Sequence, residues 1–227
     1  MQAPPSPSTI GTSVQGRPVL ATTLGPGDEL IVFVAGIHGS EPAGVTLARR
    51  LVTELHHNPK LLHSRRVVVV ENANPDGLAT GQRFNVNGVD LNRNFPAGNH
   101  NPRRDRHGDA PLSEPESRAL HDLFLALPQP KRVITLHQPL TCVDYDGPED
   151  TTRPLAEALS RHSGLPVKRL GSRPGSMGSW LGVDRGTPTV TMEFLESDTH
   201  LTDEALWEKY GQMMLTAVAY PEAFEQA

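Results

Sequence analysis

The chain has 227 residues, of which 37% are hydrophobic and 21% charged, and its formal net charge is −5 at pH 7. These values are typical of a globular protein with a buried core, built as one large domain or two small ones. A nucleic-acid-binding protein would carry a strongly basic face, whereas basic residues here cluster only briefly, at 103–106, so we expect no nucleic-acid partner.

The N-terminus and the cysteine content bear on location. Residues 1–9 are rich in Pro and Ser and lack the apolar core of a secretory signal. No apolar run approaches the ~20 residues of a membrane-spanning helix, and a single cysteine, Cys142, excludes an intrachain disulfide. We therefore expect a flexible leader over residues 1–9 and one domain over 10–227, in a cytoplasmic protein that does not bind membranes. Nothing in the sequence indicates an oligomeric state.

Segments typical of strands alternate with segments typical of helices. Strands are predicted where apolar and β-branched residues run together, and helices where apolar residues recur at helical spacing. In chain order, the expected strands cover residues 17–24 (an edge strand), 29–37, 66–73, 131–137, 165–170 and 187–195. The expected helices cover residues 42–57, 113–127, 152–163 and 202–220. This alternation predicts an α/β fold, in which one domain holds a mixed, mainly parallel β-sheet sandwiched by helices.

Local signals suggest where these elements begin. Ser40 and Thr202 are good N-cap residues for the first and last helices, and the pair Ser113 and Glu116 fits a capping box. The segment at 74–77, Asn-Pro-Asp-Gly, predicts a sharp turn. Two regions, 78–112 and the glycine-rich 171–178, lack periodicity and are expected to be loops. A loop as long as the first is usually functional.

The strand at 29–37 is followed by two residues that can bind a metal. His38 lies in the turn after the strand, and Glu41 lies in the first turn of the next helix. Ligand sites in α/β folds gather at the carboxyl ends of strands. Zinc accepts imidazole and carboxylate ligands, and a catalytic zinc needs three of them plus an open position. The alternative is a histidine that bonds to a loop beside an acid that caps the helix.

Two later strand ends carry further candidates. His137 would complete a set of two histidines and one carboxylate, although a histidine at a strand end can also be merely structural. Glu193 lies in an otherwise apolar strand, where an unpaired carboxylate is unusual. Such a carboxylate can take a proton from a metal-activated water and deliver it to a leaving amine. Its alternative is an ion pair with a nearby arginine.

The segment at 83–96 combines two arginines with several asparagines. Arginine binds carboxylates bidentately, and asparagine adds hydrogen-bond donors. One of the arginines, Arg83 or Arg93, is also able to polarise a carbonyl group and hold the developing oxyanion. The alternative is a loop whose Asn, Asp and Gly residues only make turns.

Together these motifs resemble the zinc metallocarboxypeptidases of the carboxypeptidase A type, the M14 family. The features that carry the resemblance occur in the family's order: His-Gly-Ser-Glu at 38–41, Asn-Pro-Asp-Gly at 74–77, Gly-Val-Asp-Leu-Asn-Arg-Asn-Phe-Pro at 88–96, His137 and Glu193. The third motif is highly specific, whereas His-x-x-Glu is specific only beside the others.

The resemblance covers about residues 30–196 and implies a role for each matching residue. It implies that His38, Glu41 and His137 hold one zinc ion per chain. It also implies that Arg83 stabilises the oxyanion, that Asn92 and Arg93 bind a substrate carboxylate, and that Glu193 is the general base and then the acid. The implied partner is a small peptide substrate with a free carboxylate.

The chain also departs from the digestive members of the family. Those enzymes carry a tyrosine some twenty residues before the catalytic glutamate, whereas the interval 147–193 contains no tyrosine. The usual specificity position falls near Gly178, which indicates neither an aromatic nor a basic preference. With its short length and the segment His-Gln-Pro-Leu at 137–140, the chain looks most like bacterial murein peptide amidases. Those enzymes cleave the γ-D-glutamyl–meso-diaminopimelate bond during cell-wall peptide recycling.

Other functions remain open at this point. An ordinary carboxypeptidase would use the same residues on C-terminal peptides. A deacylase of the aspartoacylase and succinylglutamate desuccinylase type shares the zinc ligands, although the longer motif at 88–96 and the strand acid Glu193 favour the peptidase. A zinc-free peptide-binding protein would be expected to lack a ligand or the base, and none is missing.

Overall fold

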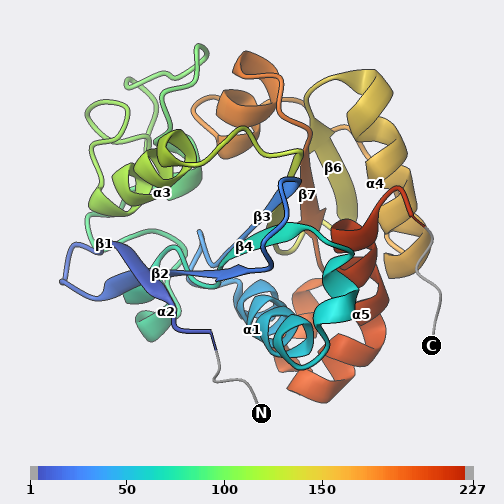
Figure 1. The fold of residues 1–227 in the computed structure, drawn as a ribbon. Helices are drawn as coiled ribbons and strands as arrows, with labels where there is room; N and C mark the ends of the chain where they lie inside the picture. The colour runs from blue at the N-terminus through green and yellow to red at the C-terminus, as the bar shows by residue number, and fades with distance from the viewer. Residues whose placement is uncertain (1–4, 223–227) are drawn as a thin grey trace.

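A seven-stranded mixed β-sheet forms the centre of the fold (Figure 1). The structure is a computed structural model that describes residues 5–222, so residues 1–4 of the expected leader lie outside it. In chain order the strands are β1 Ser8–Thr12, β2 Pro18–Leu24, β3 Leu30–Ala35, β4 Arg66–Val70, β5 Arg132–His137, β6 Cys142–Asp146 and β7 Thr189–Glu193. The first strand therefore begins at Ser8, within the range that we expected to be the leader.

The strands are arranged in the order β1-β2-β4-β3-β5-β7-β6. The four central strands β4, β3, β5 and β7 are parallel, whereas β1, β2 and β6 pair with their neighbours antiparallel. The central strands are buried on both faces, which explains their near-continuous apolar sequences. The predicted α/β fold with a mixed, mainly parallel sheet in one domain is confirmed.

Helices cover both faces of this sheet (Figure 1). One face packs against α1 Pro42–His57, α4 Glu149–Ser163 and α5 Asp203–Ala219, through a core that includes Leu51, Leu159 and Met213. The other face packs against α3 Pro115–Ala126 and the π-helical turn η3 Gly178–Asp184, with Phe95 stacked on Trp180. Within residues 5–222, no helix is both long enough and apolar enough to cross a bilayer.

Four short helical segments complete the fold: α2 Pro75–Thr80, η1 Pro59–Leu62, η2 Leu91–Arg93 and η4 Glu196–His200. The first of them corrects a prediction, because Asn74 caps α2 by accepting a hydrogen bond from the Gly77 amide, where we expected a simple turn.

Two strands were missed from the sequence, and one expected strand is absent. Strand β1 covers the outer side of β2, so the prediction that 17–24 forms an edge strand is wrong. Strand β6 was missed because its acids, Asp144 and Asp146, interrupt the apolar pattern although both are buried. Residues 165–170 form no strand and make one isolated bridge, between Val167 and Val143.

Several predicted helix starts also change. Ser40 does not cap α1, because the N-cap residue is Glu41 and its side chain is engaged elsewhere. Ser113 and Glu116 form no capping box, since the Ser113 hydroxyl donates to the Glu114 carboxylate. Helix α4 begins at Glu149, earlier than the predicted cap at residue 152. The cap at Thr202 is confirmed, because its side chain accepts a hydrogen bond from the Ala205 amide at 3.2 Å.

The sheet order brings the predicted site residues to one edge. Strands β3, β5 and β7 are adjacent and parallel, so their carboxyl ends lie side by side. His38 follows β3, while His137 and Glu193 end β5 and β7 and are partners in the β-sheet register. Parallel topology alone therefore gathers side chains that are up to 155 positions apart in the sequence.

Candidate active site

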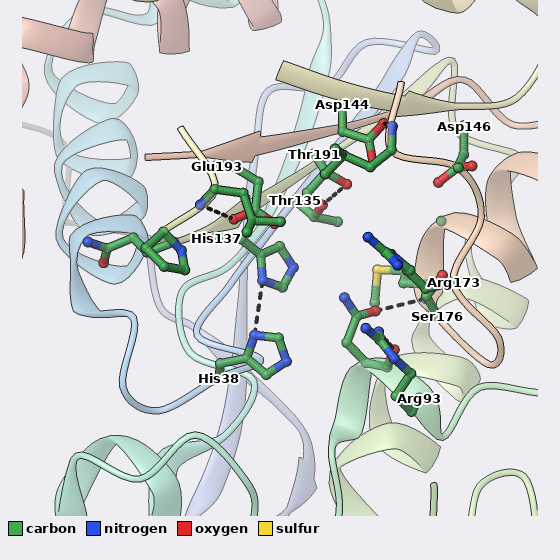
Figure 2. A pocket seen from close by; sticks show the side chains of 18 of the residues that line it. His38, Arg93, Thr135, His137, Asp144, Asp146, Arg173, Ser176, Thr191 and Glu193 are labelled. Carbon is green, nitrogen blue, oxygen red and sulfur yellow. Dashed lines mark hydrogen bonds between the residues drawn. The ribbon is translucent and has the colours of Figure 1, made fainter. Parts of the chain in front are cut away.

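A cavity of about 160 Å³ opens at this edge of the sheet (Figure 2). Its lining includes all the predicted site residues except Glu41, namely His38, Arg83, Asn92, Arg93, His137 and Glu193. It also includes residues that were not predicted, among them Thr135, Asp144, Asp146, Arg173 and Thr191. The structure thus joins the predicted residues to a larger polar pocket.

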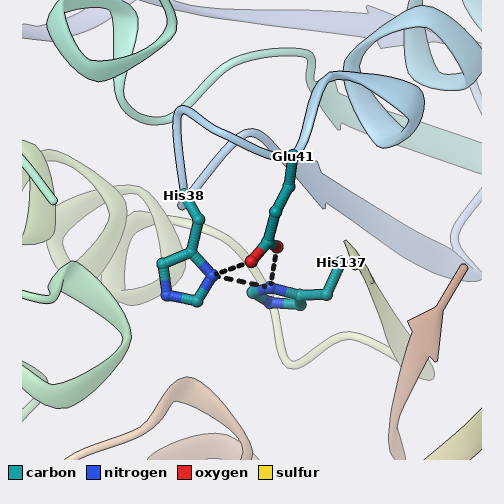
Figure 3. Close-up of side chains that lie close together, drawn as sticks. All are labelled: His38, Glu41 and His137. Carbon is teal, nitrogen blue, oxygen red and sulfur yellow. Dashed lines mark hydrogen bonds and ion pairs between the residues drawn. The ribbon is translucent and has the colours of Figure 1, made fainter. Parts of the chain in front are cut away.

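Three predicted ligand residues meet at one side of the cavity (Figure 3). His38 Nδ1 lies 2.8 Å from Glu41 Oε1, and His137 Nδ1 lies 3.0 Å from Glu41 Oε2. The two histidine Nδ1 atoms are 3.2 Å apart. All three side chains are buried, and one potential ligand atom of each lies within 4.8 Å of the other two.

This donor set fits a zinc ion. Four-coordinate zinc holds nitrogen and oxygen ligands at about 2.0–2.2 Å, which places neighbouring ligand atoms roughly 3.3–3.6 Å apart in a tetrahedron. The separations between the donors, 2.8 to 3.2 Å, need only a small outward movement to reach that spacing. Two imidazoles and one carboxylate beside a cavity leave the fourth position for water or substrate.

Asp90 supports His38 from behind and was not among the predicted residues. Its Oδ1 lies 2.9 Å from His38 Nε2, the ring nitrogen that faces away from the other two ligands. The same oxygen accepts a hydrogen bond from the Asn92 amide at 2.9 Å. A carboxylate behind a metal-binding histidine fixes its orientation and tautomer. The sequence showed Asp90 only as part of a loop motif, because its partner lies 52 positions away.

The buried charges of this cluster shift one another's proton affinity. Burial alone would raise the pKa values of Glu41 and Asp90, but hydrogen bonds with the histidines outweigh it and hold both pKa values well below their usual range. Burial alone would lower the pKa of His38, but hydrogen bonds with Asp90 and Glu41 raise it. Both carboxylates are therefore ionised at neutral pH, and Glu41 is the one placed to bind a cation together with the two histidines.

Glu193 ends β7 beside His137, its partner in the β-sheet register. It is 9% exposed and lines the cavity, and its Oε2 accepts a hydrogen bond from the Leu140 amide at 3.3 Å. That contact holds one carboxylate oxygen, and the residue forms no ion pair with an arginine within residues 5–222. A carboxylate in this position is suited to proton transfer.

Arg83 reaches the cluster from the loop after α2. Its Nη1 lies 2.7 Å from Glu41 Oε1, and its Nη2 lies 3.6 Å from Asp90 Oδ2. The side chain is 39% exposed and lines the cavity. The structure therefore places Arg83 next to the candidate metal site.

Asn92 and Arg93 line the cavity from the short helix η2. The Asn92 side-chain oxygen accepts a hydrogen bond from the Met177 amide at 2.9 Å, which directs its NH₂ group away from that contact. Arg93 Nη1 donates to the Asn92 carbonyl at 2.6 Å. Burial lowers the pKa of Arg93, and the charges of Arg83 and Arg173 lower it further. Guanidinium groups that repel one another in this way favour the binding of an anion.

Comparisons with known proteins agree with this geometry. The model of the family described as zinc carboxypeptidase matches residues 6–162. Murein peptide amidase A of Escherichia coli (strain K12) is 35% identical over 209 residues, which cover 84% of this chain and 82% of that protein. Murein peptide amidase A of Vibrio campbellii is 34% identical over 222 residues, covering 88% and 83%.

Solved structures show the same fold. The crystal structure of murein-tripeptide amidase from Escherichia coli O157 superposes with a TM-score of 0.76 at 32% identity, covering 97% of this chain and 94% of that one. Thrombin-activatable fibrinolysis inhibitor has a TM-score of 0.79 at 18% identity, covering 94% of this chain and 67% of that one, which is a likeness of fold alone.

Proposed function

This chain belongs to the zinc carboxypeptidase family and is a hydrolase, and from that premise we propose that it cleaves the γ-D-glutamyl–meso-diaminopimelate bond of murein peptides. The observation that carries the proposal is the meeting of His38, Glu41 and His137 beside one cavity with Glu193. The choice of substrate is supported by the two murein peptide amidases that share about a third of their residues with this chain over most of its length.

The proposed metal ligands are His38, Glu41 and His137, with Asp90 holding His38 in place. When bound, the zinc supplies a Lewis acid that polarises the scissile carbonyl and activates water near neutral pH. Glu193 accepts a proton from the attacking water and then delivers a proton to the leaving amine, which is general base and general acid catalysis by one group.

Two further roles fall to the positively charged wall of the cavity. Arg83, which lines the cavity beside the candidate metal site, donates hydrogen bonds to the oxygen of the scissile carbonyl as negative charge develops there. Asn92 and Arg93 bind the carboxylate of the amino acid that will be released, so the reacting bond is held in one orientation. This arrangement requires a substrate with a free carboxylate next to the cleaved bond.

The proposed setting is the recycling of cell-wall peptides in the cytoplasm. The chain's only cysteine, Cys142, is buried and free, which suits a reducing compartment.

The test is hydrolysis of L-Ala-γ-D-Glu-meso-diaminopimelate by the zinc-loaded protein, followed by the release of free diaminopimelate. Glu193→Gln keeps the shape of the side chain and removes the base, so we expect zinc binding to persist while kcat falls about 10²–10⁴-fold. Glu196→Gln is the matched control, because Glu196 is exposed and lies just beyond β7.

Release of diaminopimelate by the wild type and the control but not by Glu193→Gln would support the bond, the reaction and the base together. A zinc-containing protein that releases no diaminopimelate would overturn the murein substrate while leaving the hydrolase assignment intact. Acyl amino acids and ordinary C-terminal peptides would then be assayed in the same way. Near-normal kcat in Glu193→Gln would show that another group is the base.

A further inference from the structure

The sheet face beneath the cavity is polar across three neighbouring strands. The register aligns the side chains of β5, β7 and β6 in rows, since His137 pairs with Glu193, and Thr135 pairs with Thr191, which in turn pairs with Asp144. Asp146 lies one row further, opposite Thr189. Alternate residues of a strand point to the same face. These side chains therefore share the sheet face of His137 and Glu193, which we call the catalytic row, and extend that face further into the pocket.

Asp144 and Asp146 are buried in this surface and form no ion pair with another residue of the range 5–222. They are 8% and 7% exposed, and both line the cavity. Asp144 Oδ1 accepts hydrogen bonds from the Tyr145 and Leu170 amides, and Asp146 Oδ1 accepts one from the Ser172 hydroxyl. Within residues 5–222, the Oδ2 atom of neither aspartate has a hydrogen-bond partner.

Two glycines make room for Asp146. A Cβ atom at Gly178 would lie 2.2 Å from Asp146 Oδ2, and one at Gly182 would lie 2.5 Å from Asp146 Cβ. Any side chain at Gly178 would therefore occupy the position of this carboxylate. The absence of side chains at Gly178 and Gly182 in η3 thus leaves space for the carboxyl group of Asp146.

The charges across the pocket are opposite in sign. Figure 2 shows Asp144 and Asp146 along one side of the cavity, with Arg93 and Arg173 across from them. No close ion pair joins the two sets within residues 5–222. Arg169, whose charge acts on Asp146, forms its ion pair with Glu149 instead, at 2.9 Å. The pocket therefore presents both charges to whatever enters it.

We propose that Asp144 and Asp146 bind an ammonium group on the side chain of the amino acid that is released, and that Arg173 binds a carboxylate carried by the same side chain. This inference rests on the proposed function for the direction of the substrate, because Asn92 and Arg93 must hold its main-chain carboxylate. It assigns specificity for a diamino acid to strand β6.

The spacing of the rows suits such a substrate. Two residues along a strand cover about 6.6 Å, so Asp144 lies roughly one side-chain length below the catalytic row. A four-carbon side chain that descends from the reacting bond brings its terminal nitrogen to this level. The two threonines in the row, Thr135 and Thr191, bond to each other at 2.9 Å and line the path.

The pKa values of the two aspartates agree with a role in binding a cation. Burial raises the pKa of Asp144 to about 6, and the nearby charges of Asp146 and Glu193 add to the effect. Burial also raises the pKa of Asp146. An ammonium ion between them would stabilise the ionised forms that burial disfavours.

The test compares four γ-D-glutamyl substrates that differ only in the released residue. Diaminopimelate carries both side-chain groups, lysine carries the ammonium alone, 2-aminopimelate carries the carboxylate alone, and norleucine carries neither. Asp144→Asn and Asp146→Asn are the test variants, and Asp150→Asn, an exposed residue of α4, is the matched control.

We expect each test variant to lower kcat/KM by about 10- to 100-fold for the diaminopimelate and lysine substrates, the range for losing a hydrogen bond to a charged group. The kcat/KM values for the norleucine and 2-aminopimelate substrates should change little. Arg173→Ala should instead lower kcat/KM for the diaminopimelate and 2-aminopimelate substrates. Equal losses on all four substrates would overturn the inference, because they would indicate general damage to the pocket.

The same series on a benzoylglycyl acyl group separates this inference from the murein assignment. One outcome is that γ-D-glutamyl peptides are not cleaved, whereas benzoylglycyl-lysine is cleaved in preference to benzoylglycyl-norleucine. If Asp146→Asn removes this preference for lysine, the specificity inference is supported and the murein substrate is contradicted. If γ-D-glutamyl peptides are cleaved with no preference for an ammonium group, the murein substrate is supported and the specificity inference is contradicted. Calorimetric binding of free lysine, with free norleucine as control, tests the acidic site without turnover, and equal affinities would contradict it.

Discussion

At the scale of single residues, Arg83 occupies two environments at once. Its guanidinium contacts the buried carboxylates of Glu41 and Asp90, and its partly exposed side chain also lines the cavity. We expect Arg83→Ala to lower kcat by about 10²–10³-fold, the usual loss when one oxyanion donor is removed. Steady-state kinetics on the tripeptide would measure the effect, with metal content checked in parallel. An increase in KM with unchanged kcat would reassign Arg83 to substrate binding.

Asp90 gives a second prediction at this scale. It bonds to His38 on the side away from the cavity, so Asp90→Asn should weaken zinc binding about 10- to 100-fold without removing a ligand. Competition with a chelator would measure the affinity. The control is Asp122→Asn, whose carboxylate is 75% exposed on α3. Unchanged affinity would mean that the loop alone fixes the orientation of His38.

Which residues could be predicted depends on how local their signals are. His38, Glu41 and His137 each follow or end a strand, and the parallel sheet then brings them together. Asp90 and Asp146 acquire their roles from partners on distant segments, through a histidine and through a glycine that leaves space. Spacing within the sequence does not reveal such contacts, so the candidate metal ligands were predictable whereas Asp90 and Asp146 were not.

At the scale of elements, the two predicted serine and threonine caps give a matched pair. Thr202 accepts a hydrogen bond from the Ala205 amide at the start of α5, whereas Ser40 is exposed and caps nothing. Thr202→Ala should therefore lower the free energy of unfolding by about 1 kcal/mol, and Ser40→Ala should leave it nearly unchanged. Urea unfolding of both variants would measure this. A loss of similar size at Ser40 would contradict the assignment of Glu41 as the N-cap.

The elements that could be predicted share one property, which is a buried apolar face with a regular period. Helix α1 was predicted with the bounds that the structure shows, and the four parallel strands were all found. Strand β1 was missed because it is short, polar and largely exposed, and β6 because its acids face the pocket. A strand whose polar residues line a pocket therefore lacks the regular apolar pattern by which strands are predicted from sequence.

At the scale of the whole molecule, the pocket makes stability depend on pH. The pKa of Asp144 is about 6 in the fold against 3.8 for the ordinary side chain, so the folded state binds more protons than the unfolded state between these values. Its contribution to stability is lost as pH rises through that window. Asp76 has the opposite sign, because hydrogen bonds from Gln15 and Arg17 outweigh burial and lower its pKa.

We therefore expect Asp144→Asn to be more stable than the wild type above about pH 6, by on the order of 1 kcal/mol, and to match it below about pH 4. Asp76→Asn should be less stable than the wild type at neutral pH, with the difference shrinking as pH falls through the acid range. Denaturant unfolding across this pH range would measure both. An Asp144→Asn variant that is less stable at pH 7 would show that a bound cation already compensates the charge.

The residues of the two proposed roles of the cavity, hydrolysis and recognition of the released amino acid, are distributed differently along the chain. The proposed metal ligands and the base come from three separated segments, whereas much of the remaining lining, from Leu140 to Gly178, belongs to one continuous stretch between His137 and Glu193. Insertions or recombination within that stretch would change the proposed pocket for the released amino acid and leave the proposed metal ligands and base in place. Related enzymes with the same hydrolytic residues would then differ in the peptides that they cleave.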